Sequence, residues 1–494
     1  MANLCFLPVW DTLLSGSFFV PSCSTRDCAA VVLNVLLLAA LLTAARRLAV
    51  RYRWASYLDA CLRGFVTLAI AAMAVLTCFR VSAAALTLRL ANLLGGTVAV
   101  YFGVAMLALA ALVLVASHRR LAAGLQTVLL IFAPLVPITF FQAAWLGLRS
   151  GNGARADVLG FGGPNTSSAG RVLWLLFDEW DQRTTFVQRP AALKLPEIDR
   201  LVAQAIYCTD AYPPGNETLS SIPSLLSGRQ VSQYAVARPH QLLITFAHDF
   251  QPADWRTLPS IFDKARQAGV PAAVVGWYIP YCELFGRSLA SCSWQPWPTL
   301  PIRRRSETAG IMLDQVRSLS PWSRPFFHLA KYQLLLADAK EAAASPRLRL
   351  IFVHWPVPHF PAIYDRARKE FTTFPVRIPQ DWYLENLALV DRTLGDLRTT
   401  MQSAGTWENT TILVTSDHSL RVPGKQDHRV PFILKMAGQQ VPLVYSRSFN
   451  TIITHELLLA LLQGQLAGVD DVSAWIDHHR SVVGPPNSAR SSSE

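Results

Sequence analysis

"NTTILVTSDHS", residues 409–419, begins as an almost continuous apolar run and ends in the polar residues Ser416, Asp417 and His418. Short runs of this kind are typical of strands that are buried on both faces of a parallel sheet. Open α/β sheets bind their ligands at the carboxyl ends of such strands. We therefore expect Asp417 and His418 to stand at a functional edge of a sheet.

The same pattern recurs between residues 171 and 435. Further apolar runs are "RVLWLLFD" (171–178), "VPAAVVGW" (270–277), "LRLIFVHW" (348–355) and "VPFILK" (430–435). Helical stretches at 195–205, 258–269 and 381–405 lie between them. This alternation predicts an α/β domain with a mostly parallel central sheet.

Groups that can bind a metal follow several of these predicted strands. Asp178 and Glu179 follow the first run, His354 and His359 lie at the end of another, and His428 precedes the last. Carboxylate and imidazole ligands suit zinc best, with manganese as the second choice. We predict that Asp178, Asp417 and His418 bind a divalent metal, with Glu179 as a further candidate ligand. Taken singly, each residue has an ordinary structural role, such as a helix cap or loop packing, and only the set favours a metal site.

A segment rich in hydroxyls, "NETLSSIPSLLSGR" (216–229), contains Thr218, which can complete a tetrahedral ligand set. Such residues before an apolar run are also ordinary helix N-caps. A metal lowers the pKa of a bound water to about 7, and we expect it to acidify a bound threonine in the same way. Thr218 is therefore a candidate metal-bound nucleophile.

The N-terminal part of the chain is much more apolar than the rest. Four predicted membrane spans lie at 28–45, 64–79, 91–117 and 121–148, with a fifth if residues 5–20 also cross. Basic clusters at 46–53 and 117–120 place those loops in the cytoplasm and everything after about residue 149 outside it. We expect a transmembrane domain at 1–149, a linker at 150–170, a catalytic domain at 171–480 and a disordered tail at 481–494.

The net charge of +12 suits a protein that works beside anionic lipid headgroups. Nucleic acid is not expected as a partner, because no basic helix or aromatic–basic repeat is present. Cys282 and Cys292 can pair in an oxidising compartment, as can Cys23 and Cys28. Cys208 is then left single.

The segments "VLWLLFDE", "NETLSSIPSLLSGR", "HWPVPHFP", "YLENLALVDRTLGDL" and "NTTILVTSDHS" follow one another with the spacing of sulfatase-like enzymes. Residues 170–465 resemble the alkaline phosphatase superfamily, and within it the membrane-anchored phosphoethanolamine transferases and lipoteichoic acid synthases. The resemblance implies an α/β sulfatase-like domain behind an N-terminal helical membrane domain.

The resemblance also implies roles for single residues. Thr218 matches the nucleophile on two counts: it lies eleven residues before Arg229, as in sulfatases, and it opens "TLSSIP", which is similar to the T-x-x-S-x-P of the transferases. The sulfatase pattern places an arginine where this chain has Ile222, and its modified residue is Cys or Ser. These departures favour phosphoryl chemistry over sulfate ester hydrolysis. His354, His359 and His428 resemble substrate-facing histidines, with His359 and His428 also as acid–base candidates.

Together these observations predict a metal-dependent, membrane-anchored phosphoryl transferase with a threonine nucleophile. It would move a phospholipid headgroup phosphate to an envelope glycan or lipid acceptor, in a multi-pass protein of the bacterial inner membrane with its catalytic domain in the periplasm. Two alternatives stay open: a phosphodiesterase, phosphatase or sulfatase-type hydrolase of the same fold, and a non-catalytic lipid-binding membrane sensor.

Overall fold

A computed structural model describes residues 2–14, 18–19, 24–51, 133–149, 170–237, 241–296, 307–320, 323–373, 382–422 and 427–480. The chain divides into two compact units. The first combines residues 1–15, 22–153 and 304–323, and the second combines 16–21, 154–303 and 324–494.

The described part of the first unit is helical. Its helices are α1 (Ala2–Cys5), α2 (Leu7–Leu14), α3 (Thr25–Arg51), α7 (Leu135–Arg149) and α12 (Thr308–Ser318). Within α3, Thr25–Ala45 is long and apolar enough to cross a membrane, and it corresponds to the first predicted span. The predicted spans 64–79 and 91–117 lie outside the described residues, and α7 covers the end of the span predicted at 121–148. The structure therefore contains one apolar helix of spanning length among its described residues.

Polar side chains tie these helices together. The Asn34 amide on α3 donates to the Gln315 side chain on α12 at 3.0 Å, and Gln315 in turn donates to the Asp27 carbonyl at 3.0 Å. The Trp10 indole donates to the side chain of Asn3 at 2.8 Å. The association of α12 with the N-terminal helices was not predicted from the sequence. The domain boundaries at residues 149, 170 and 480 stay a prediction.

The second unit is built around a nine-stranded mixed sheet, ordered β13-β2-β12-β11-β1-β8-β6-β7 with β14 also paired to β2. Its strands are β1 (Val172–Asp178), β2 (Ile206–Tyr212), β6 (Ala272–Trp277), β7 (Ser291–Gln295), β8 (Leu350–Pro358), β11 (Thr411–Ser416), β12 (Val430–Lys435), β13 (Leu443–Tyr445) and β14 (Phe449–Asn450). The five predicted strands are all present, and β11, β1, β8, β6 and β7 run parallel. The strand β12 differs from a purely parallel pattern, because it pairs antiparallel with both β11 and β2.

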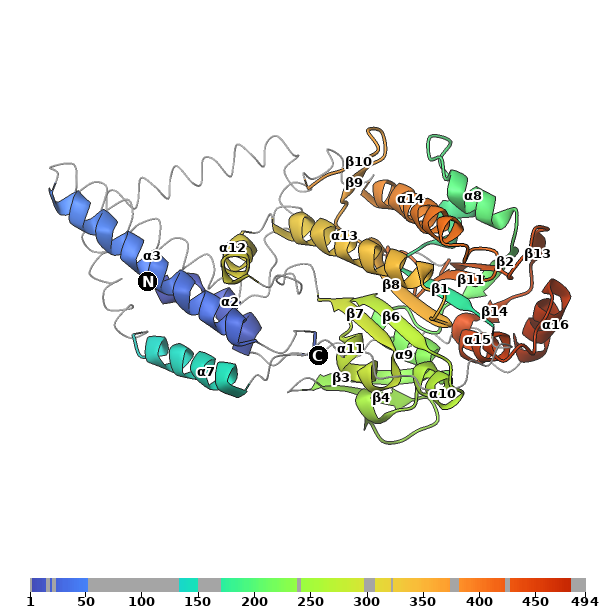
Figure 1. The fold of residues 1–494 in the computed structure, drawn as a ribbon, viewed down its shortest axis with the longest axis horizontal. Coiled ribbons are helices and arrows are strands. Elements are labelled where there is room, and N and C mark those ends of the chain that lie inside the picture. The colour runs from blue at the N-terminus through green and yellow to red at the C-terminus, as the bar shows by residue number, and fades with distance from the viewer. Residues whose placement is uncertain are drawn as a thin grey trace. The chain divides into compact units, whose positions relative to one another are not determined.

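Helices cover both faces of this sheet (Figure 1). Alternate residues of β1 divide between two cores: Val172, Trp174 and Leu176 belong to one, and Leu173, Leu175 and Phe177 to the other. The first core includes α9 (Thr218–Ser227), α10 (Ile261–Gln267), α11 (Tyr281–Phe285), α15 (Thr454–Leu462) and α16 (Val469–His479). The second includes α8 (Pro196–Val202), α13 (Ser323–Ala344) and α14 (Trp382–Ser403). Burial of β1 on both faces explains why its sequence reads as a continuous apolar run.

Smaller elements complete the unit. A three-stranded sheet consists of β3 (Val231–Ala237), β4 (Gln241–Phe246) and β5 (Ala253–Asp254), and β9 (Tyr364–Asp365) pairs with β10 (Glu370–Phe371). Cys282 and Cys292 form the disulfide that the sequence allows. Cys208 carries a buried free thiol, whereas Cys23 lies outside the described residues.

Candidate active site

The parallel pairing of β1 with β11 brings two aspartates together. Phe177 lies opposite Ser416 in the register, so the next residues, Asp178 and Asp417, leave the sheet side by side. Both side chains are buried, at 2% and 0% exposure. Asp417 is held in place because its Oδ1 accepts the backbone N–H groups of His418 (2.9 Å) and Glu179 (3.3 Å).

Thr218 reaches the same point from another layer. It is the first residue of α9, after the N-cap Glu217, and its hydroxyl donates to Asp417 Oδ2 at 2.8 Å. The structure shows that Thr218 is not the helix cap. Glu217 occupies the cap position, and the Thr218 oxygen turns to the strand-end carboxylates, at a helix end whose dipole favours negative charge.

His418 completes a group of four donor atoms. Its Nδ1 lies 3.0 Å from the Ser419 carbonyl, and because a carbonyl can only accept, Nδ1 carries the hydrogen and Nε2 keeps its lone pair. This Nε2 lies 3.4 Å from Thr218 Oγ1, 3.4 Å from Asp178 Oδ1 and 3.5 Å from Asp417 Oδ2. Two carboxylates, a hydroxyl and an imidazole thus converge on one point.

The three distances from His418 Nε2 match the ligand separations of a tetrahedral metal site. Zinc bonds of about 2.0–2.1 Å place ligand atoms about 3.3–3.4 Å apart on the edges of a tetrahedron. Three of the four measured contacts lie within about 0.2 Å of that edge, and the fourth is the shorter Thr218–Asp417 hydrogen bond. Asp178 Oδ1 is buried and has no hydrogen-bond partner among the described residues, as expected for an atom whose natural partner is a cation.

The pKa shifts of Asp178 and Asp417 also suit a metal site. Burial, together with the charges of Asp417 and Glu179, raises the pKa of Asp178 well above its usual value. Burial also acts to raise the pKa of Asp417, but the neighbouring His418 and His354 and the Thr218 hydrogen bond outweigh it, so this pKa is lowered. A bound divalent cation would favour the charged form of both carboxylates.

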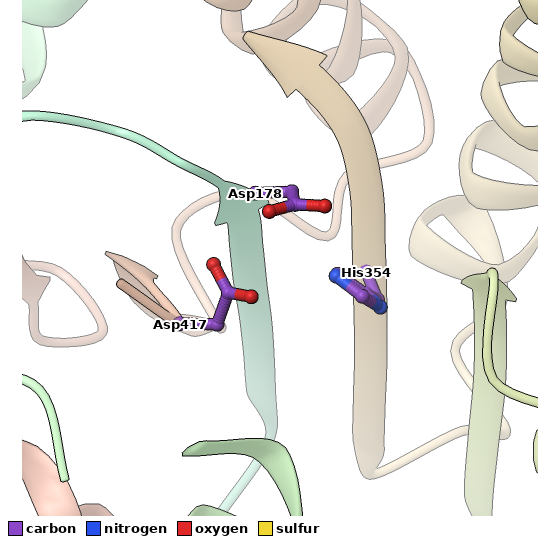
Figure 2. A group of neighbouring side chains, drawn as sticks. All are labelled: Asp178, His354 and Asp417. Carbon is purple, nitrogen blue, oxygen red and sulfur yellow. The ribbon is translucent and has the colours of Figure 1, made fainter. Parts of the chain in front are cut away.

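His354 lies beside the aspartates rather than at the surface. One ring nitrogen of His354 and one oxygen each of Asp178 and Asp417 are within 4.8 Å of one another, which makes a second possible ligand group (Figure 2). However, Trp277 Nε1 donates to His354 Nε2 at 3.2 Å, and the Tyr281 hydroxyl bonds Nδ1 at 2.9 Å. Burial lowers the pKa of His354 to about 4, so it is a neutral ring with both nitrogens engaged.

The His354 side chain is fully buried, and the substrate-binding role predicted for it stays a prediction. We favour His418 over His354 as the nitrogen ligand, since its Nε2 lies 3.4–3.5 Å from all three oxygens, whereas both ring nitrogens of His354 are hydrogen-bonded. His354 instead packs behind the aspartates, on the fully buried strand β8.

The other predicted residues are spread around this centre. His359 is 8% exposed, its Nδ1 donates to the Phe360 carbonyl at 2.7 Å, and burial lowers its pKa. His428 is partly buried just before β12, and no hydrogen bond or ring contact joins it to the four donor residues within the described part of the chain. Glu179 does not join the metal group: its Oε1 accepts from Arg421 Nε at 2.7 Å.

The sequence did not predict the cluster of Trp277 and three histidines next to these residues. The Trp277 ring contacts His328, His354 and His359 at centroid distances of 5.8, 6.1 and 5.6 Å. His328 is buried on α13, and burial and the nearby His359 lower its pKa well below the usual value. The only sequence signal was the position of Trp277 at the end of a predicted strand. Nothing in the helix around His328 marks it.

Comparison with known proteins identifies the family of the chain. The sulfatase family model matches residues 172–463, which is more than half of the chain. No protein of curated function matches the sequence significantly. Solved structures that resemble the fold include Ps i-CgsB, with 14% identity over 63% of this chain and 76% of that chain and a TM-score of 0.46.

Two further similar structures come from named organisms. PsFucS1 sulfatase from Pseudoalteromonas sp. shows 16% identity, covering 62% of this chain and 69% of its own, with a TM-score of 0.43. The lipoteichoic acid synthase LtaP from Listeria monocytogenes shows 12% identity, covering 62% and 76%, with a TM-score of 0.40. These values are too low to identify a substrate. On the family match, the chain belongs to the sulfatase family, whose enzymes use a divalent metal.

Proposed function

We propose that this enzyme is a membrane-anchored phosphoryl-group transferase that uses Thr218 as its nucleophile. The donor would be a membrane phospholipid, and the acceptor an envelope glycan or lipid. The observation that carries the proposal is the Thr218 hydroxyl, 2.8 Å from Asp417 Oδ2 and 3.4 Å from His418 Nε2 in a buried group of metal-binding atoms. A threonine placed only as a helix cap would have no need of these partners.

Zinc is the metal that we propose, with manganese as the alternative. The donor set contains one imidazole and three oxygens, with the imidazole nitrogen 3.4–3.5 Å from each oxygen, and zinc accepts such ligands readily. A divalent cation held by Asp178, Thr218, Asp417 and His418 would acidify the threonine hydroxyl and stabilise charge on the phosphoryl group.

The residues themselves suggest the route of the first half-reaction. Thr218 Oγ1 forms a bond to phosphorus while the bond from phosphorus to the diacylglycerol oxygen breaks. The threonine hydroxyl would give up its proton to solvent before the attack, since the bound cation would lower its pKa, while Asp417 stays ionised and orients the oxygen. His428 supplies the proton of the leaving oxygen. The α9 N-terminus lies at the site of attack and favours the anionic phosphothreonine.

The second half-reaction reverses these roles. The acceptor hydroxyl bonds to phosphorus, the bond to Thr218 breaks, and the threonine oxygen leaves as the anion with which the cycle began. The acceptor proton goes to His359, which is suited to be a base because burial lowers its pKa and keeps the ring neutral at pH 7. The two histidines then exchange a proton through solvent, which restores the starting state.

A hydrolase is the second candidate, with water in place of the acceptor hydroxyl. A sulfatase-type reaction fits less well, because Ile222 is fully buried in α9 where sulfatases have an arginine, and Thr218 cannot become a formylglycine. A lipid-binding sensor would have no use for the convergent donor atoms. The distinction between transferase and hydrolase depends on which acceptor reaches the phosphoenzyme.

Location in a bacterial inner membrane, with the catalytic unit in the periplasm, is part of the same proposal. Support comes from the apolar α3 helix and from the Cys282–Cys292 disulfide, which suits an oxidising compartment. A multi-pass anchor stays a prediction, since most of the apolar segments lie outside the described residues.

The experiment is turnover of phosphate-labelled phospholipid vesicles by the detergent-solubilised full chain loaded with Zn²⁺. We expect diacylglycerol release in step with label on Thr218, followed by transfer to an added glycan or lipid acceptor. Prompt appearance of the label in water-soluble products without an acceptor would favour the hydrolase. No turnover with Zn²⁺ or Mn²⁺ would favour the sensor.

A further inference from the structure

One positively charged side chain near the candidate site, Arg421, has no role in the mechanism proposed above. Arg421 lies three residues after His418, in the turn that follows β11, and its Nε donates to Glu179 Oε1 at 2.7 Å. Glu179 itself directly follows Asp178 and has a φ of 64°, a left-handed conformation that few residues other than glycine adopt. The ion pair thus connects the two turns that carry the aspartate ligands.

The two partners differ sharply in burial. The Glu179 side chain is 7% exposed, whereas that of Arg421 is 51% exposed. Only Nε of Arg421 makes a hydrogen bond to the described residues, so its two terminal amino groups remain available for a ligand. Half-exposed ion pairs contribute little to stability, so stabilisation alone is a weak reason for this arrangement.

The charges around the pair favour an anion. Burial acts to lower the pKa of Arg421, but the charges of Glu179, Asp178 and Asp417 outweigh it and raise the pKa. On the other side of Glu179, the Arg324 guanidinium interacts electrostatically with the same carboxylate. The Glu179 carboxylate therefore interacts with two cations, Arg421 and Arg324. With the aspartates neutralised by a divalent metal, this edge of the site carries excess positive charge.

We propose that Arg421 is a substrate-binding residue whose terminal amino groups hold a non-bridging anionic oxygen of the phosphoryl group, and that Glu179 fixes the guanidinium for this task. The inference rests on the proposed function and adds the group that recognises the substrate's charge. A phosphodiester has two non-bridging oxygens: one can face the four donor residues, and the other the Arg421 fork. Planar guanidinium groups match this geometry, whereas a lysine offers only a point charge.

The test compares Arg421→Ala and Arg421→Lys with the control Arg256→Ala in the Zn²⁺-loaded full chain. Arg256 is 43% exposed and pairs with Asp254, so the control removes a similar surface ion pair elsewhere. The probes are turnover of bis(4-nitrophenyl) phosphate and binding of inorganic phosphate by calorimetry. For Arg421→Ala we expect kcat/KM and phosphate affinity each to fall by about 10- to 100-fold, as for a lost charged hydrogen bond.

Chemical rescue separates binding from structural support. Added guanidinium ion at millimolar concentration should restore part of the Arg421→Ala activity, and should not activate the wild type or the control. Arg421→Lys should keep part of the phosphate affinity and show a larger loss in kcat/KM. Arg256→Ala should stay within about twofold of the wild type on both probes, as expected for a surface ion pair.

Two results would overturn the inference. One is unchanged phosphate affinity in Arg421→Ala. The other is a loss of turnover that guanidinium does not restore and that accompanies a lower unfolding temperature. The proposed function is tested separately by Thr218→Val: if that variant turns over normally, the nucleophile assignment fails, whereas phosphate binding to Arg421 can still be measured.

Discussion

Replacement of Thr218 by valine removes the hydroxyl and keeps the shape of the side chain. In the structure this hydroxyl makes one buried hydrogen bond to a carboxylate, at 2.8 Å to Asp417 Oδ2, and the side chain is 8% exposed. A hydrogen bond to a charged group contributes about 1.5–3 kcal/mol to stability. For a unit of this size, that corresponds to a fall in unfolding temperature of about 5 °C or less, so Thr218→Val should still fold.

The effect on catalysis should be far larger. Loss of the nucleophile in enzymes with covalent intermediates removes about 10⁶ of the rate, and we expect a loss of at least about 10⁴, or about 5 kcal/mol of barrier, here. Thr218→Ser keeps the oxygen and loses only the methyl group that restricts its rotamer, so we expect about a tenfold loss. The serine variant is therefore the matched control for the valine variant.

The assay combines turnover of labelled phospholipid with mass spectrometry of the peptide that contains residue 218. Wild type and Thr218→Ser should carry a phosphorylated species at this position, and Thr218→Val should carry none. If Thr218→Val retains more than about 1% of the wild-type rate, the covalent mechanism through this oxygen is refuted, whatever the fold of the variant.

Three further predictions concern the metal and the stability of the catalytic unit. Asp178→Asn should weaken Zn²⁺ binding, measured by calorimetry, by at least about 100-fold, because even outer-shell changes cost 10- to 100-fold; affinity within tenfold of the wild type would exclude this ligand. Asp391 accepts two backbone hydrogen bonds at 2.8 Å at the start of α8. Asp391→Ala should therefore lower the unfolding free energy by about 1–2 kcal/mol. Asp391→Asn keeps an acceptor oxygen and should lower it by less. Burial lowers the pKa of His455 to about 4, so the unfolded chain takes up the proton first and stability falls as the pH drops from about 6.5 to 4. His455→Gln should reduce that fall by up to about 3 kcal/mol, seen as a flatter dependence of unfolding temperature on pH; an unchanged slope would contradict it.

Much of the catalytic fold could be predicted from local sequence. The runs that became β1, β6, β8, β11 and β12 are continuously apolar, because strands covered on both faces have no solvent side that would require alternation. The antiparallel direction of β12 could not be predicted in this way. Strand direction depends on the path of the connecting chain, and the composition of a buried strand is the same in either direction.

The candidate site also contains residues that could be predicted from local sequence and residues that could not. That Asp178, Asp417 and His418 stand at strand ends follows from their positions beside apolar runs, and Thr218 was chosen from spacing and resemblance. Glu179 and His354 show what sequence could not supply. Both are of the right chemical type, yet Arg421 engages the first and Trp277 and Tyr281 surround the second.

The sequence by itself determined five strands of the central sheet and the polar residues at their ends, because a continuous apolar run is a local property of the chain. The strands β2, β7, β13 and β14 have no such run and were not predicted. Only the tertiary structure decided which of these residues lie close together, which carboxylate pairs with a guanidinium and that His328 lies near His359. Those facts depend on distances of a few ångströms between residues far apart in sequence, such as Thr218 and Asp417, which are 199 positions apart. Contacts of this kind are fixed by packing and sheet register, and no local pattern encodes them.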